Sequence, residues 1–124
     1  EVAPQLRQIY DAVLKAHDLA IAQVRPGVAL RELDAVARRH IAACGYGDFF
    51  GHGLGHGVGL QVHEYPTVSS RSEAVAEPGM VFTVEPGIYL PEVGGVRIED
   101  MVEVTDDGCR PLTQIPKAFR TLPA

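Results

Sequence analysis

The sequence lacks the features of a membrane protein, a disulfide-rich protein or a nucleic-acid-binding protein. It contains only two cysteines, Cys44 and Cys109, which lie far apart and have neither a metal-binding nor a redox spacing. We therefore expect two free, reduced thiols in a cytoplasmic protein. No apolar run approaches the length that spans a bilayer, and we find no secretory signal at the start, so no membrane partner is expected. A formal net charge of -5 argues against electrostatic binding to nucleic acid.

The composition that is present is typical of a soluble globular protein. The chain has 124 residues, enough for one ordinary domain, and 46% of them are hydrophobic while 22% are charged. It begins at Glu1 without a methionine and enters a helical pattern almost at once. We therefore expect this chain to be a piece of a longer protein.

The first 45 residues have the pattern of two helices. Apolar or small residues recur at helical spacing over 6–24, with Pro4 suited to the first turn and the segment 25–27 ending the helix. A second helix is predicted over about 30–44, with Gly45 as its C-terminal cap. The side chains expected on the solvent face of this second helix are those of Arg38, Arg39 and His40.

Helical periodicity stops after residue 45, and the rest of the chain has the pattern of a mostly antiparallel sheet. Residues 80–85 and 96–105 have the composition of strands, and Asp107-Gly108 marks a turn. Two helices followed by such a sheet favour an α+β fold. We expect one domain over 1–124, with a helical part at 1–45 and a sheet part at 46–124 that carries the site.

Glycine occupies every second position of the segment Gly51–Gly59. Inside a helix each glycine costs about 1 kcal/mol relative to alanine, so the segment is predicted to be extended. In an extended chain His52, Leu54 and His56 share one face. The glycine positions then form an edge without side chains, which lets another backbone or a ligand come close.

Histidines are concentrated in the same region. His52, His56 and His63 are three of the five histidines, and they fall within twelve residues. A lone histidine is more often a structural residue, which is our interpretation of His17 and His40. Three histidines in and just after a glycine-rich strand instead favour a functional site.

Two glutamates complete the candidate site. Glu85 ends an apolar strand, and Glu99 lies in the second predicted strand, where alternation places it on the same face as Arg97. A carboxylate in so apolar a strand needs a partner, because burial of an unpaired charge is costly. The partner of Glu99 is either Arg97, in a surface ion pair, or a metal ion. Two strand glutamates beside a histidine strand suit a carboxylate-rich metal site.

Three motifs, in this order, resemble the pita-bread metallopeptidases, which include Xaa-Pro aminopeptidases, prolidases and methionine aminopeptidases. They are GHGLGHGVGLQVHE at 51–64, TVEPGIY at 83–89 and GGVRIEDMVEVT at 94–105. The doubled histidine and the Arg-Ile-Glu-Asp strand resemble the proline-specific branch. The resemblance implies the second half of a pita-bread fold with a curved sheet, and hydrolysis of X-Pro bonds by an exopeptidase.

The resemblance also implies a metal centre. His56 resembles the metal-binding histidine, Glu85 a metal ligand that also contacts the nucleophilic water, and Glu99 the carboxylate that bridges both metals. Two divalent ions are implied in the complete enzyme. Oxygen-rich ligands with one histidine suit manganese, while cobalt or zinc could replace it.

Further residues resemble the catalytic and substrate-binding groups of the family. His63 resembles the histidine that stabilises the tetrahedral intermediate, and Glu85 is the second expected catalytic residue. His52 and Arg97 resemble residues that bind substrate near the proline. Tyr89 is a further residue expected at the pocket wall.

In this family the first half of the catalytic domain supplies two aspartates to the metals, and no matching pair is present here. The aspartates outside the third motif and the turn after it lie on predicted helices or stand alone, namely Asp11, Asp18, Asp34 and Asp48. We therefore expect the chain to be the C-terminal half, with the missing N-terminal half as a partner. The other expected partners are a proline-containing peptide or dipeptide and, in a homodimer, a second copy.

Two other functions stay open at this point. The first is a catalytically inactive pita-bread module that binds peptides or proteins, although the three intact ligands argue against it. The second is another reaction on the same fold, such as creatine hydrolysis. The motifs also leave open whether the enzyme is a dipeptidase or an aminopeptidase.

Overall fold

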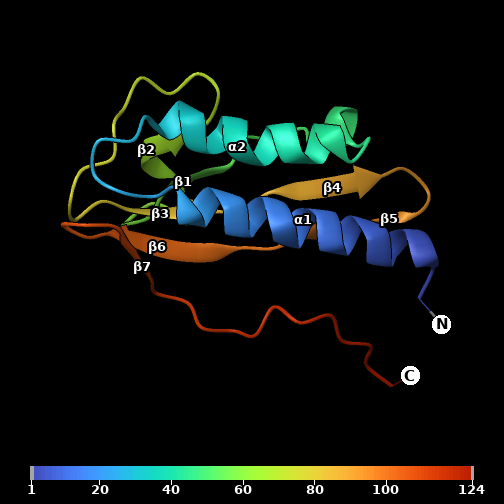
Figure 1. The fold of residues 1–124 in the computed structure, drawn as a ribbon. Helices are drawn as coiled ribbons and strands as arrows, with labels where there is room; N and C mark the ends of the chain where they lie inside the picture. The colour runs from blue at the N-terminus through green and yellow to red at the C-terminus, as the bar shows by residue number, and fades with distance from the viewer. Residues whose placement is uncertain (1, 124) are drawn as a thin grey trace.

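The computed structural model describes residues 2–123, and it has two helices followed by a mostly antiparallel sheet, which confirms the predicted α+β class (Figure 1). In chain order the elements are α1 (Pro4–Ala22), α2 (Leu30–Ala43), the 3-10 helix η1 (Gly47–Phe49), β1 (Gly55–Gly57), β2 (Glu64–Val68), β3 (Val81–Val84), β4 (Gly87–Leu90), β5 (Gly94–Arg97), β6 (Asp100–Val104) and β7 (Cys109–Pro111).

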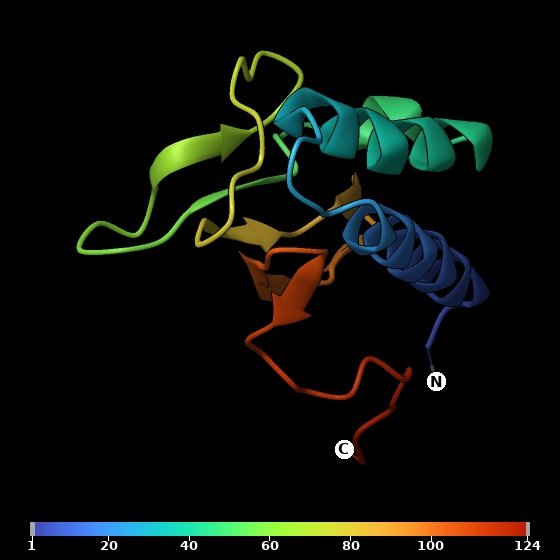
Figure 2. The ribbon, with the colours of Figure 1, turned by 60° about the vertical axis from the view of Figure 1, so that its left-hand side comes forward.

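The two helices pack against each other and against the strands, and Figure 2 shows them on one side of the sheet. The larger sheet has the strand order β2-β1-β3-β6-β7 with antiparallel neighbours, while β4 and β5 form a separate antiparallel hairpin beside α1. The hydrophobic core includes Ile9, Val13, Leu33, Phe82 and Val102, all fully buried. The helices thus cover one side of the sheet that carries the candidate site.

Both predicted helices are present, with ends close to those expected. Pro4 occupies the start of α1, and Gly45, with a φ of 90°, follows the end of α2 in the left-handed conformation that favours glycine. Arg38, expected on the solvent face of α2, is only partly exposed. Its guanidinium is held by the buried carboxylate of Asp34 on the preceding turn, with Nε 2.9 Å from Oδ1.

The predicted strand over 96–105 is in fact two strands in two different sheets. β5 pairs with β4, whereas β6 pairs with β3, and the chain changes partner at Ile98 and Glu99. Ile98 is buried at this change and its N–H donates to Pro86 O over 3.3 Å, while Glu99 stays exposed. The strands β2, β4 and β7 were not predicted, because each lies next to turn residues.

The glycine-rich segment is extended only in part. Within it only Gly55–Gly57 forms a strand, and Leu54 is fully buried in the core instead of sharing a face with His52 and His56. The chain is irregular before β1, so strict alternation does not apply there. No helix among residues 2–123 combines the length and apolar character needed to cross a membrane.

Candidate metal centre

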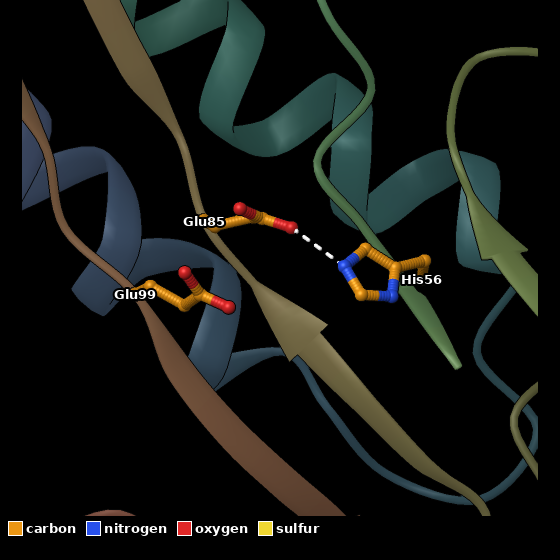
Figure 3. A group of neighbouring side chains, drawn as sticks. All are labelled: His56, Glu85 and Glu99. Carbon is orange, nitrogen blue, oxygen red and sulfur yellow. Dashed lines mark ion pairs between the residues drawn. The ribbon is translucent and has the colours of Figure 1, made fainter. Parts of the chain in front are cut away.

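The register of β3 and β6 places two carboxylates side by side. Val84 pairs with Asp100 at the last position of this antiparallel ladder. Glu85 follows Val84, and Glu99 precedes Asp100, so both glutamates leave the same end of the ladder. His56 comes from β1, the other neighbour of β3. Figure 3 shows the three side chains directed into one space from these three segments.

These three side chains have the geometry of a metal-binding group. One donor atom from each of His56, Glu85 and Glu99 lies within 4.8 Å of the other two. His56 Nε2 is 3.1 Å from Glu85 Oε1, and both side chains are largely buried. Although Glu99 is exposed as a residue, partial desolvation of its carboxyl group and the neighbouring Glu85 carboxylate raise its pKa. One imidazole and two repelling carboxylates are a donor set that fits a divalent cation such as manganese, cobalt or zinc.

The orientation of His56 suits metal binding. Its Nδ1 donates to the Gly57 carbonyl over 2.8 Å, which leaves Nε2 as the nitrogen that faces Glu85 with a free lone pair. The donor role is assigned from the partner, because a carbonyl oxygen only accepts hydrogen bonds.

Thr83, which was not among the residues predicted from the sequence, orients both His56 and Glu85. This side chain is only 2% exposed. Its Oγ1 donates to Glu85 Oε1 over 3.0 Å and accepts the N–H of His56 over 3.1 Å. A threonine two residues before a strand glutamate lies on the same face as that glutamate, so alternation is the signal that could have revealed it.

Close packing of β1 on β3 explains why glycine precedes His56. A Cβ on Gly55 would lie 1.8 Å from Thr83 O, a distance that no side chain tolerates. The bare edge predicted from the sequence therefore serves the approach of a neighbouring backbone. It brings His56 against the strand that carries Glu85.

A cavity of about 450 Å³ opens beside these residues, and His52, His56, His63, Glu85 and Arg97 all line it. The ring of His63 is 4.2 Å from that of His56, centre to centre, and its side chain is exposed. His63 is absent from the group of candidate metal ligands. A second cavity of about 400 Å³, on which His56, His63 and Glu85 also border, extends toward Val62 and Met101.

His52, Tyr89 and Arg97 form a chain of contacts along the cavity. His52 Nδ1 donates to Gly53 O over 2.7 Å, so its Nε2 accepts from the Tyr89 hydroxyl over 2.8 Å. Arg97 Nη1 donates to the same hydroxyl over 3.5 Å, and its Nε lies 3.5 Å from Glu85 Oε2. The ion pair of Arg97 is therefore with Glu85, and the alternative of an Arg97–Glu99 pair is wrong.

Asp34 and Arg38 hold the irregular segment that carries His52. Arg38 donates to the carbonyl oxygens of Phe50 and His52, each over 2.8 Å. Asp34 Oδ2 accepts from the Leu54 N–H over 3.0 Å. Because Asp34 also binds Arg38, the pair fixes residues 50–54 to helix α2. The sequence signal was an aspartate and an arginine four residues apart on one helix.

Six of the site residues predicted from the sequence line one or both of these cavities: His52, His56, His63, Glu85, Arg97 and Glu99. Tyr89, expected at the pocket wall, does not line them but contacts His52 and Arg97, which do. His17 is buried elsewhere, and His40 lies at the exposed end of α2 beside Cys44. Within residues 2–123 no aspartate joins the three candidate metal ligands.

The chain belongs to metallopeptidase family M24, whose family model matches residues 1–106. This confirms the family and the fold predicted from the sequence, and the family implies divalent metal ions.

Among individual proteins, it is 57% identical over 113 residues to the uncharacterised peptidase YqhT of Bacillus subtilis, covering 91% of this chain and 32% of that protein. It is similar to the solved Xaa-Pro dipeptidase from Bacillus anthracis, with a TM-score of 0.93, 47% identity, and coverage of 95% of this chain and 33% of that one. The X-Pro aminopeptidase from Thermotoga maritima gives a TM-score of 0.92 at 44% identity, covering 95% and 34%. The chain thus spans about a third of the length of these relatives.

Proposed function

We propose that the protein carrying this chain is a metal-dependent exopeptidase that hydrolyses X-Pro bonds, as an Xaa-Pro aminopeptidase or dipeptidase. The observation that carries the proposal is the convergence of His56, Glu85 and Glu99 at the wall of a cavity that His63 and Arg97 also line. The names of the similar dipeptidase and aminopeptidase support the substrate class.

His56, Glu85 and Glu99 would hold divalent ions, with manganese as the best fit to their donors. Two such ions, when bound, supply a water of lowered pKa and polarise the scissile carbonyl. The remaining chemistry belongs to the protein. Glu85, between Thr83 and Arg97, takes the proton of the water and delivers it to the leaving proline nitrogen.

His63 donates a hydrogen bond to the oxyanion that develops on the carbonyl, where a donor has its largest effect. Its exposed ring beside His56 is free to meet a substrate. His52 and Arg97 bind the substrate on the proline side of the cavity, and their shared contact with Tyr89 fixes their orientation. These groups accept a proline-containing peptide or dipeptide.

The complete enzyme requires more than residues 1–124. We propose that this chain is the C-terminal half of the catalytic domain, with its helical part at 1–45 and its sheet part with the metal site at 46–124. The N-terminal half supplies two aspartate ligands. We further propose a cytoplasmic homodimer. A catalytically inactive binding module has less support, because it would not need three intact metal ligands around one space.

The test is peptide hydrolysis by the full-length protein with Mn²⁺. We expect cleavage of Ala-Pro or Met-Pro bonds and little cleavage of Met-Ala-Ser, with Glu99→Gln as the metal-site control. Faster cleavage of Met-Ala-Ser would assign the protein to the methionine branch. Tight peptide binding without any hydrolysis would support the inactive module.

A further inference from the structure

Asp100 is a buried carboxylate that the proposed mechanism does not use. It immediately follows Glu99, and only 5% of it is exposed. Its backbone pairs with that of Val84 at the end of the β3–β6 ladder, and Val84 immediately precedes Glu85. Whatever fixes Asp100 therefore fixes the point from which both glutamates leave the sheet.

Three side chains from outside the ladder meet the Asp100 carboxylate. Lys117 Nζ lies 2.8 Å from Oδ1, and the hydroxyl of Thr113 donates to the same oxygen. Nε2 of His17 on α1, a side chain 3% exposed, lies 3.0 Å from Oδ2 without forming a hydrogen bond. The other ring nitrogen of His17 donates to Asp18 Oδ1 over 2.9 Å.

Two of these partners come from the C-terminal segment 112–119, which has no regular secondary structure and runs beneath α1 and β6 in the view of Figure 1. The N–H of Leu112 donates to Met101 O over 2.7 Å. The hydroxyl of Tyr10 donates to Lys117 O over 2.6 Å, and its ring meets the ring of Phe119 edge-on at 5.1 Å. The segment is thus attached both to β6 and to α1.

Glu99 itself has no such support. It lies between β5 and β6, outside both ladders, and its side chain is exposed. Its carboxylate faces that of Glu85, whose negative charge repels it. The separation of the two carboxylates is therefore set through the two buried neighbours of Glu99, which are Ile98 and Asp100.

We propose that Thr113 and Lys117, acting through Asp100, are positioning residues that hold Glu99 at the distance from Glu85 that a divalent cation needs. The C-terminal segment 112–119 is then a functional part of the metal centre. This inference rests on the proposed function, because it assumes that Glu99 binds metal. Losing a group that orients a metal ligand costs about tenfold to a hundredfold in metal affinity, and an indirect partner belongs at the lower end.

The experiment uses the full-length protein and measures Mn²⁺ affinity by calorimetry and the absorption spectrum of bound Co²⁺. Lys117→Met should weaken Mn²⁺ binding about tenfold and change the Co²⁺ spectrum. Lys117→Arg, which keeps the charge, should restore both. Lys15→Met, which removes the chain's other lysine from an exposed site on α1, is the matched control and should change neither.

Thr113→Val serves if Lys117→Met does not fold, and it should weaken Mn²⁺ binding to a smaller extent. Wild-type affinity and an unchanged Co²⁺ spectrum in the folded Lys117→Met or Thr113→Val protein would overturn the inference while leaving the metal centre intact. Absence of Mn²⁺ binding in the wild type, or binding unaffected by Glu99→Gln, would overturn the proposed function as well.

Discussion

At the scale of single residues, Glu85 is the side chain on which the site converges. Its Oε1 contacts His56 Nε2 and the Thr83 hydroxyl, and its Oε2 faces Arg97 Nε. His63 differs, because its ring lies against His56 without belonging to the group of metal donors. The two residues should therefore respond differently to substitution.

In the full-length protein, Glu85→Gln should lower both metal content and turnover, whereas His63→Ala should lower turnover alone. Loss of one oxyanion donor typically costs on the order of a hundredfold in rate. Metal analysis beside steady-state kinetics distinguishes the two variants. Near-normal turnover of Glu85→Gln, or an emptied metal site in His63→Ala, would show that the roles are misassigned.

At the scale of elements, the site is assembled by three adjacent strands and one helix. The β3–β6 register sets the two glutamates, β1 brings His56, and α2 holds residues 50–54 through Asp34 and Arg38. The Asp34 side chain is 1% exposed, while Arg38 remains 34% exposed. The buried partner should therefore matter more than any exposed ion pair on the same helix.

Asp34→Ala should lower the free energy of unfolding by about 3 kcal/mol, because it leaves the partly buried guanidinium of Arg38 and the Leu54 N–H without their carboxylate partner. Arg39→Ala is the control. Its ion pair with Glu32 is more than half exposed on both sides, so the loss should be about 0.5 kcal/mol or less. Urea unfolding of both variants measures the difference. Equal losses would mean that the Asp34–Arg38 pair is not a structural clamp.

The sequence revealed the elements whose signal is local. Helical periodicity located α1 and α2, and the three motifs identified His56, Glu85 and Glu99. The division of the strand at Glu99 was not visible, because it depends on which distant strand each half pairs with. The contacts of Asp34 and Arg38 with residues 50–54 and the partners of Asp100 were missed for the same reason, since these contacts join residues far apart in the chain.

At the scale of the whole molecule, the chain has surface that the described residues leave uncovered. Leu60, Val62 and Tyr65, on and beside the β1–β2 connection, are respectively 107%, 73% and 71% exposed. Exposed apolar groups of this size favour contact with another segment or subunit. The chain also covers about a third of each of its relatives. Both facts fit a site that other parts of the protein complete.

Residues 1–124 alone should not hydrolyse X-Pro peptides at a useful rate, even with added Mn²⁺. Without the two aspartates proposed for the N-terminal half, one or both metal positions lose ligands and charge compensation, so the ions would be held loosely. Adding that half should restore metal binding and activity. Peptidase assays and metal stoichiometry with and without it make the comparison. Full activity of the purified chain alone would refute this assignment of ligands.

Anomalous X-ray diffraction from crystals of the full-length protein with Mn²⁺ would show whether His56, Glu85 and Glu99 form a metal centre. We expect anomalous peaks in contact with His56 Nε2 and with the carboxylates of Glu85 and Glu99. Manganese bound elsewhere in the protein, with no peak beside these three side chains, would contradict this expectation.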